Sequence, residues 1–186
     1  MLKSRFRGDE LIPTINSYSK TMRLVVGALL GSIAVIFQSA GIFTGIGYIL
    51  SMMSTGPLVL ATLLSLRIGV MTYFGTIFLL AMLQPSELLV FIFTTGLLGL
   101  SLGCGLKYLK RSIFIIPFAA LWLTIGINIL LYGFKFTILG PLVTTDFSSW
   151  VILGTYGFSL LYSWIWKKLS ISAFKVLNNV FKGTLI

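Results

Sequence analysis

The chain contains no histidine, a single cysteine and only four acidic residues among its 186 residues. The acidic residues Asp9, Glu10, Glu87 and Asp146 are widely separated. A zinc, haem or iron–sulfur site needs several clustered His, Cys or carboxylate ligands. The single thiol, Cys104, cannot form an internal disulfide bond. We therefore expect no metal site and no cofactor.

The same scarcity argues against catalysis. Cys104 has no evident general base, since histidine is absent. A phosphate-binding glycine loop followed by Lys and Ser or Thr is also missing, so we expect no ATP hydrolysis by this chain. Proton-driven carriers use acidic or histidine side chains within the membrane, and no apolar stretch contains one. We predict that the protein is not an enzyme.

Charge is scarce overall, at 10% of residues, whereas 57% of residues are hydrophobic. A bilayer core of about 30 Å needs roughly 20 apolar residues for each helical crossing. We predict an all-α polytopic integral membrane protein whose six-helix transmembrane bundle spans residues 22–166. A tail, residues 1–21, precedes it, and a basic amphipathic tail, residues 167–186, follows it. The expected crossings are 22–38, 46–66, 68–83, 88–106, 113–132 and 148–166.

Basic residues are distributed very unevenly in this topology. With a cytoplasmic N-terminus, thirteen of the fourteen Lys and Arg residues lie on the cytoplasmic side, and only Lys135 lies outside. Basic residues are retained inside during insertion, so both termini are expected in the cytoplasm. We expect a multi-pass protein of the plasma membrane that attracts anionic lipid headgroups. The net charge of +10 is spread over separate loops, which argues against nucleic-acid binding.

Three local patterns qualify this scheme. Gly56-Pro57, near the middle of crossing two, predicts a kink, because proline removes a backbone donor. Only Arg67 separates crossings two and three, which predicts a tight helical hairpin. The C-terminal tail carries apolar residues near helical spacing and is expected to lie on the inner membrane face. These residues are Ile171, Phe174, Leu177 and Phe181.

Small residues follow one face of two crossings. In crossing one they are Gly27 and Gly31, with a second pair, Ala28 and Ser32, beside them. Such a face lets another helix approach closely. Docking of a partner and packing within the bundle are both possible for crossing one. For crossing four, whose small residues are Gly96, Gly99 and Gly103, internal packing is favoured.

Polar and aromatic side chains in the outer halves of crossings four to six are the candidate substrate-binding residues. An amide such as Asn128 inside a membrane needs a hydrogen-bond partner, either a ligand or another helix. Tyr132 and Trp150 could instead belong to the interfacial aromatic belt. Glu87 could cap the start of crossing four, and Lys135 could be a solvated loop charge. The candidates are Asn128, Trp122, Tyr132, Thr94, Thr95, Trp150 and Tyr156.

The whole pattern resembles a known family. Six crossings, internal termini, a small-residue face on crossing one and the stretch PSELLVFIFTTGLLGLSLGCGLKYLKRS, residues 85–112, resemble the substrate-binding S components of energy-coupling factor (ECF) vitamin transporters. The resemblance implies that the first helix docks onto a coupling transmembrane subunit. The matching positions are Gly27, Ala28, Gly31 and Ser32. It also implies two cytoplasmic ATPases, and a small-molecule ligand bound at the outer side and released inward when the subunit topples.

The sequence therefore favours a substrate-binding membrane subunit of an ATP-driven, ECF-type importer of a small molecule or vitamin. One alternative is a non-transporting membrane scaffold in a cell-envelope or morphogenesis complex, favoured by the basic tail and the few polar groups within the membrane. A second alternative is a self-contained carrier or channel.

Overall fold

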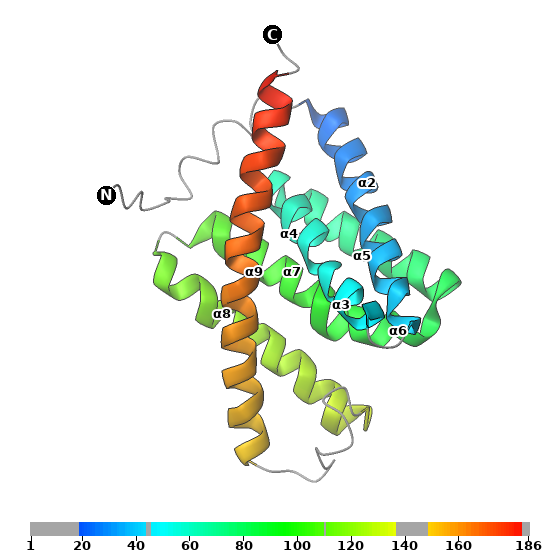
Figure 1. The fold of residues 1–186 in the computed structure, drawn as a ribbon, viewed down its shortest axis with the longest axis vertical. Coiled ribbons are helices and arrows are strands. Elements are labelled where there is room, and N and C mark those ends of the chain that lie inside the picture. The colour runs from blue at the N-terminus through cyan, green and yellow to red at the C-terminus, as the bar shows by residue number, and fades with distance from the viewer. Residues whose placement is uncertain (1–18, 44–45, 110, 137–148, 184–186) are drawn as a thin grey trace.

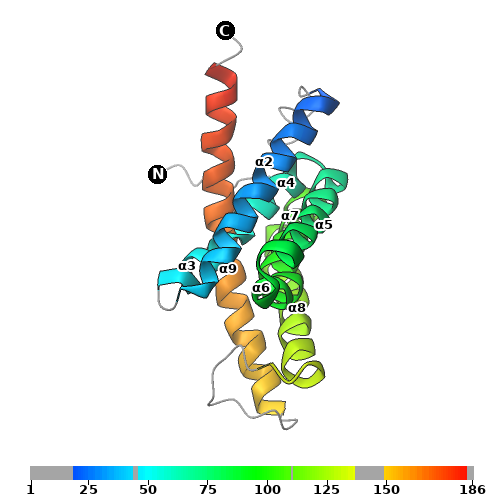
Figure 2. The same cartoon turned by 90° about the vertical axis from the view of Figure 1, so that its right-hand side faces the viewer.

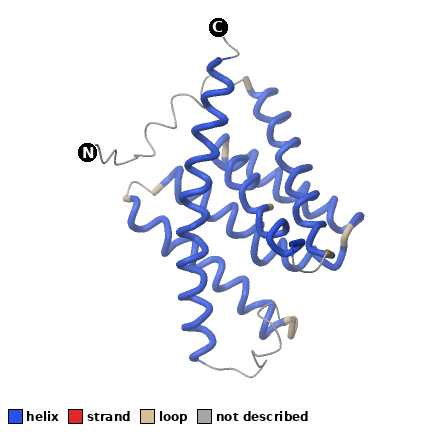
Figure 3. Tube along the Cα trace, in the orientation of Figure 1, coloured by secondary structure: helices blue, strands red, loops and turns tan. Residues whose placement is uncertain are grey.

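The computed structural model describes residues 19–43, 46–109, 111–136 and 149–183 (Figure 1). The expectations for the N-terminal tail up to residue 18, for Pro141 and for Asp146 fall outside these residues. Helices form the whole described architecture, joined by short turns (Figure 3). In chain order they are α2 (Lys20–Ser39), η2 (Ala40–Ile42), α3 (Ile46–Met53), α4 (Thr55–Leu64), α5 (Leu66–Leu83), α6 (Pro85–Val90), η3 (Phe91–Thr95), α7 (Gly96–Tyr108), α8 (Ser112–Asn128), η4 (Ile129–Gly133) and α9 (Ser149–Gly183).

Five segments are long and apolar enough to cross a membrane. They correspond to the first five expected crossings: Lys20–Ile42, Ile46–Leu64, Leu66–Leu83, Pro85–Tyr108 and Ser112–Gly133. Many large apolar side chains on them face outward, as in a protein surrounded by lipid. The outer part of α9 is long enough as well, but Gly, Ser, Thr and Tyr interrupt its apolar residues. The chain is thus all-α and of the multi-pass membrane type.

Crossing two is broken where proline was expected to break it. Helix α3 ends at Met53 and α4 begins at Thr55, so the interruption at Ser54 lies three residues before Pro57. Proline has no N–H with which to continue the ladder, and α3 turns away from α4 (Figure 2). The predicted kink is confirmed.

The tight hairpin between crossings two and three is confirmed too. A single extended residue, Ser65 (φ −165°, ψ 142°), joins α4 to α5. The two helices come so close that a Cβ atom at Gly69 would lie 2.3 Å from Oγ1 of Thr62. Glycine at this position therefore makes the hairpin possible.

Helix α4 lies at the centre of the bundle, in contact with α2, α5, α7 and α9. The glycine face of α7 packs directly on it. A Cβ atom at Gly99 would lie 2.5 Å from Cβ of Leu58, and one at Gly103 would lie 2.5 Å from Cβ of Thr62. The small residues of crossing four thus serve internal packing, as expected.

Two π-helical turns, η3 and η4, distort the first half of crossing four and the end of crossing five. They lie where α8 approaches crossing four most closely: a Cβ atom at Gly126 would lie 1.7 Å from the carbonyl oxygen of Phe93, a residue of η3. A π-turn shifts the backbone carbonyls out of the regular ladder and often marks a functional position. Only glycine allows this contact.

The C-terminal tail differs from the expectation. Helix α9 continues without a break through Lys167-Lys168 to Gly183 and projects beyond the bundle (Figures 1 and 2). Phe174 is buried in the apolar cluster that contains Leu106 and Ile115, and Ile171 packs against the same cluster. The first part of the tail therefore packs against the bundle as a continuation of α9 and is not a separate helix. The side chains of Leu177 and Phe181 lie outside the described residues.

Candidate functional site

A polar cluster built around Gln38 lies buried at the C-terminal end of α2. The Gln38 side chain is completely shielded from solvent. Its Nε2 atom donates to Oγ of Ser51 at 2.8 Å and to Oε2 of Glu87 at 2.9 Å. Its Oε1 atom accepts from Oγ of Ser54 and from Oγ1 of Thr95, each at 2.8 Å. One amide thus joins α2, α3, the α3–α4 junction, α6 and η3.

Glu87 lies in the first turn of α6, as expected for an acidic residue at a helix start, and its carboxylate also belongs to this cluster. No side-chain cap bond forms at Gln84, the residue before α6, and the Glu87 carboxylate binds Gln38 of α2 instead. Gly41 leaves room for it, because a Cβ there would lie 2.6 Å from the carboxylate. Since all four hydrogen-bonding positions of the Gln38 amide are used, the cluster holds helices together and offers no free group of that amide to a ligand.

A second set of buried polar side chains differs from the Gln38 cluster, because each has an atom without a hydrogen-bond partner. They lie on the buried face of α9 and on the helices it contacts, α4 and α8. A buried polar atom without a hydrogen bond is costly in a membrane, where water is absent. The atoms are Thr55 Oγ1, Asn128 Oδ1, Ser159 Oγ, Tyr162 OH, Ser163 Oγ and Ser170 Oγ.

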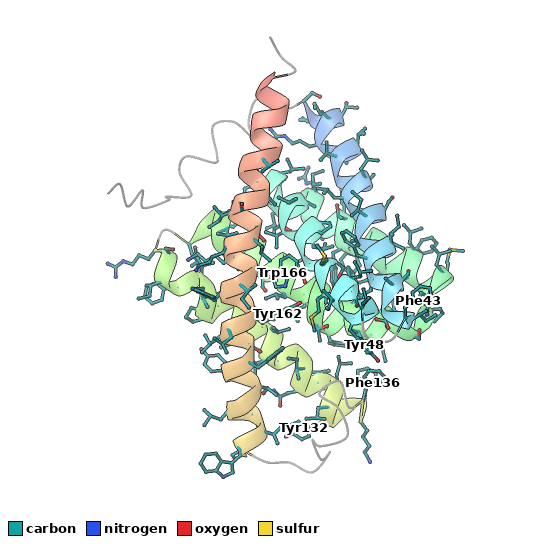
Figure 4. The ribbon with its side chains drawn as sticks, in the orientation of Figure 1. Phe43, Tyr48, Tyr132, Phe136, Tyr162 and Trp166 are labelled. Atoms are coloured by element: carbon teal, nitrogen blue, oxygen red, sulfur yellow. The ribbon has the colours of Figure 1, made fainter. Side chains whose placement is uncertain are left out.

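The centre of this set lies where the middle of α9 meets the start of α4. Tyr162 and Trp166 project from α9 toward α4 (Figure 4). The hydroxyl groups of Tyr162 and Thr55 lie near each other, yet neither makes a hydrogen bond of normal length and angle. The ring of Trp166 lies over Gly56, where a Cβ atom would be 3.2 Å away. We define the α4–α9 site as Thr55, Ser159, Tyr162 and Ser163.

The α4–α9 site is neutral and has aromatic walls. Its four polar groups are hydroxyls that can donate or accept. The rings of Phe158 and Tyr162 stack at 5.7 Å, and Trp166 meets Tyr162 edge-on at 6.3 Å. No group of three or more possible metal ligands occurs among the described residues. The site therefore places neutral hydroxyl groups beside aromatic rings.

The residues predicted to bind substrate fall into three environments. Thr95 belongs to the Gln38 cluster, and Thr94 donates to its own helix, at the Val90 carbonyl. Trp150 is 79% exposed and Trp122 is 41% exposed, so both rings face outward. Tyr132 and Tyr156 are half-buried. Within the described residues, the candidates thus lie in different local environments.

Asn128 makes the contact between helices that was one of the two alternatives given for it. Its Nδ2 atom donates to the Thr124 carbonyl at 2.7 Å and makes a longer contact of 3.4 Å with Oγ1 of Thr155 on α9. Its Oδ1 atom is buried without a partner. The side chain thus links α8 to the N-terminal part of α9.

The predicted docking residues are divided between two surfaces. Gly27 and Gly31 are buried against α5, and Oγ1 of Thr72 donates to the Gly27 carbonyl at 3.1 Å. Ala28 and Ser32 are exposed. They line an outward-facing groove of about 300 Å³ between α2 and α5, which we call the α2–α5 groove. Its other walls are Leu24, Gly27, Gly31, Ile68, Met71, Thr72, Gly75, Thr76 and Leu79.

Sequence reasoning missed Gln38 and the hydroxyls of the α4–α9 site. Gln38 could have been found as the only amide in the first apolar stretch. Thr155, Ser159 and Ser163 could have been found from their spacing of four, which places them on one helical face. Thr55 precedes Gly56-Pro57, so the predicted kink itself pointed to it.

Comparison with protein-family models, with characterised proteins and with solved structures found no match for this chain.

Proposed function

We propose that the protein is the substrate-binding integral membrane subunit of an ATP-driven importer of small molecules, similar to ECF S components. The observation that carries this proposal is the α4–α9 site. Three of its hydroxyl-bearing residues, Thr55, Ser159 and Ser163, are 0% exposed, and their hydroxyls have no partner. A binding subunit accounts for that cost, because a ligand would supply the missing hydrogen bonds.

In this proposal α9 is the sixth crossing, and both termini are cytoplasmic. The contacts of the basic residues support the placement of several helix ends together on the cytoplasmic side. Lys107 Nζ donates to the carbonyl at Leu63, the end of α4, and lies near Arg23 of α2. Lys167 Nζ donates to the carbonyl and the hydroxyl of Ser112, at 2.9 and 2.6 Å. Partial burial lowers the pKa of Lys167. Helix ends from all parts of the chain thus meet at one basic surface.

The proposed partners are a coupling transmembrane subunit and two cytoplasmic ATPases, since the sequence contains no ATP-binding loop. Affinity purification from native membranes in mild detergent, followed by mass spectrometry, tests this. We expect a coupling subunit and paired ATPases to co-purify. Recovery of envelope-synthesis proteins would support the scaffold alternative, and solute flux in liposomes without ATP would support a self-contained carrier. Either result would contradict the importer.

The α2–α5 groove is the proposed surface for the coupling subunit, and its walls allow a clean test. Ala28→Leu should fill the exposed groove and reduce co-purification of the coupling subunit about tenfold or more, with unchanged thermal stability. Gly27→Leu is the contrasting variant, because a Cβ there already lies 2.4 Å from Cγ2 of Ile68. It should lower stability itself. Normal co-purification by Ala28→Leu would exclude the groove as the docking surface.

A further inference from the structure

A group of cationic side chains lies where the start of α8 meets the middle of α9. Lys167 Nζ of α9 donates to the carbonyl oxygen and to the hydroxyl of Ser112, at 2.9 and 2.6 Å. Arg111, the residue before Ser112, is exposed, and so is Lys168, the residue after Lys167. We define the α8–α9 basic patch as Arg111, Ser112, Lys167 and Lys168.

This patch lies at the level where a membrane-crossing segment begins. Ser112 is the first residue of the apolar span Ser112–Gly133, and Lys167 is bound to it. The preceding span, Pro85–Tyr108, ends three residues before Arg111. The Lys167 ammonium is therefore held at the boundary between the apolar core of the bilayer and its polar headgroup layer.

No carboxylate of the described residues neutralises the patch. Glu87, the sole acidic side chain among them, lies near the first residue of the span Pro85–Tyr108, whereas the patch lies beyond the last residue of that span. Its carboxylate accepts a hydrogen bond from Gln38. Lys167 uses two of its three N–H groups on Ser112, so one N–H is left. The patch thus carries three positive charges and has donors left for an anion.

Exposed apolar side chains continue directly from the patch. The Lys168 Nζ atom lies 3.6 Å from the centre of the Trp164 ring, and tryptophan is typical of the membrane interface. Ile113, next to Ser112, is 73% exposed, and Phe114 is 53% exposed. A molecule bound here therefore meets cations at one end and apolar side chains at the other. An anionic phospholipid has this division, whereas a soluble anion has no acyl chain to cover the apolar side chains.

We propose that the α8–α9 basic patch binds the headgroup phosphate of an anionic phospholipid, whose acyl chains lie against the apolar start of α8. Arg111 and Lys168 supply the charge that attracts the phosphate, and guanidinium in particular matches its oxygens. Basic residues between membrane helices at a bilayer surface are the usual binding sites of such headgroups. The lipid site is independent of the proposed importer activity.

Native mass spectrometry of the detergent-solubilised protein measures this binding directly. The delipidated protein is titrated with phosphatidylglycerol and, separately, with phosphatidylcholine that has the same acyl chains. We expect phosphatidylglycerol to bind about tenfold or more tightly, because its headgroup has a net negative charge. Equal affinities would overturn the proposal. Displacement of the lipid by an equal concentration of soluble glycerol phosphate would mean that the patch binds free phosphate, and would overturn it too.

Arg111→Gln and Lys168→Gln test the patch itself. Each should weaken phosphatidylglycerol binding about fivefold and leave phosphatidylcholine binding and the melting temperature unchanged. Arg67→Gln is the matched control, because Arg67 is also exposed but belongs to α5, which packs on α2 and α4. It removes the same charge and should weaken binding less than about twofold. An equal loss in all three variants would indicate diffuse attraction by net charge and would contradict a lipid site at the patch.

A protein partner at the patch would give a different result. Arg111→Gln and Lys168→Gln would then bind phosphatidylglycerol as the wild type does and lose a protein that co-purifies from native membranes, which would exclude the lipid as the occupant. Lys167 itself is left unchanged in these tests, because it joins α9 to α8 through Ser112. The lipid titrations involve neither the coupling subunit nor the ATPases, so the importer and the lipid site can fail separately.

Discussion

Gln38→Leu should destabilise the protein by about 3 kcal/mol or more. The substitution removes an amide that makes four hydrogen bonds. It leaves three buried hydroxyls, at Ser51, Ser54 and Thr95, and the Glu87 carboxylate without the partner they share. Thermal unfolding in detergent micelles, followed by tryptophan fluorescence, measures the effect. Because the amide joins five segments of the chain, the transition should also broaden.

Gln84→Leu is the matched control for this substitution. Gln84 lies in an outer turn, where its side chain donates only to the exposed Ser86 hydroxyl. The same chemical change there should alter stability by less than about 0.5 kcal/mol. Glu87→Leu combined with Gln38→Leu should cost less than the two separate losses added together, since the residues share a bond. Strict additivity would argue that the Gln38–Glu87 contact contributes nothing.

Gly126→Ala should cost about 2–4 kcal/mol, although it adds a single methyl group. The new Cβ atom would lie 1.7 Å from the carbonyl oxygen of Phe93 and 2.8 Å from its carbonyl carbon. Both atoms belong to backbone, so no side-chain rotation relieves the overlap, and α8 must move away from η3. Chemical or thermal denaturation in detergent would record the loss.

Gly154→Ala provides the comparison, because a Cβ atom at Gly154 has nothing within 4 Å. Alanine is the better helix former, so this variant should be as stable as the wild type or more stable by up to about 1 kcal/mol. If Gly126→Ala behaved like Gly154→Ala, the close contact between α8 and crossing four would not exist in the folded protein.

Much of the fold could be predicted from hydropathy and from single residues. The starts and ends of the five apolar segments agree with the expected crossings to within three residues at most positions, because lipid requires nearly uninterrupted apolar helices. Pro57 predicted the break in crossing two. The π-turns were not predicted, because they arise from contacts between helices and have no local sequence pattern. The continuous α9 was missed because Lys167-Lys168 were expected to end the crossing, and lysine does not end a helix.

The candidate site was less predictable. Asn128 and Thr95 were selected by depth as substrate-binding candidates, and both make hydrogen bonds within the protein. Depth alone did not separate exposed rings, such as Trp150, from buried groups, because that depends on helix rotation. Ser159 and Ser163 were not predicted to be part of a site, since a serine hydroxyl usually bonds to its own helix. Their unsatisfied state became evident only from the packing of α9 on α4.

The continuity of α9 has a mechanical consequence. Its 35 residues measure roughly 52 Å along the axis, whereas a bilayer core needs only about 30 Å. The remaining roughly 20 Å is a stiff arm on the same axis as the segment that carries Tyr162. A change of about 10° in the tilt of that segment would swing the tip of the arm by about 4 Å. A tilt of α9 therefore couples movement at the α4–α9 contact to movement of the basic C-terminal end of the helix.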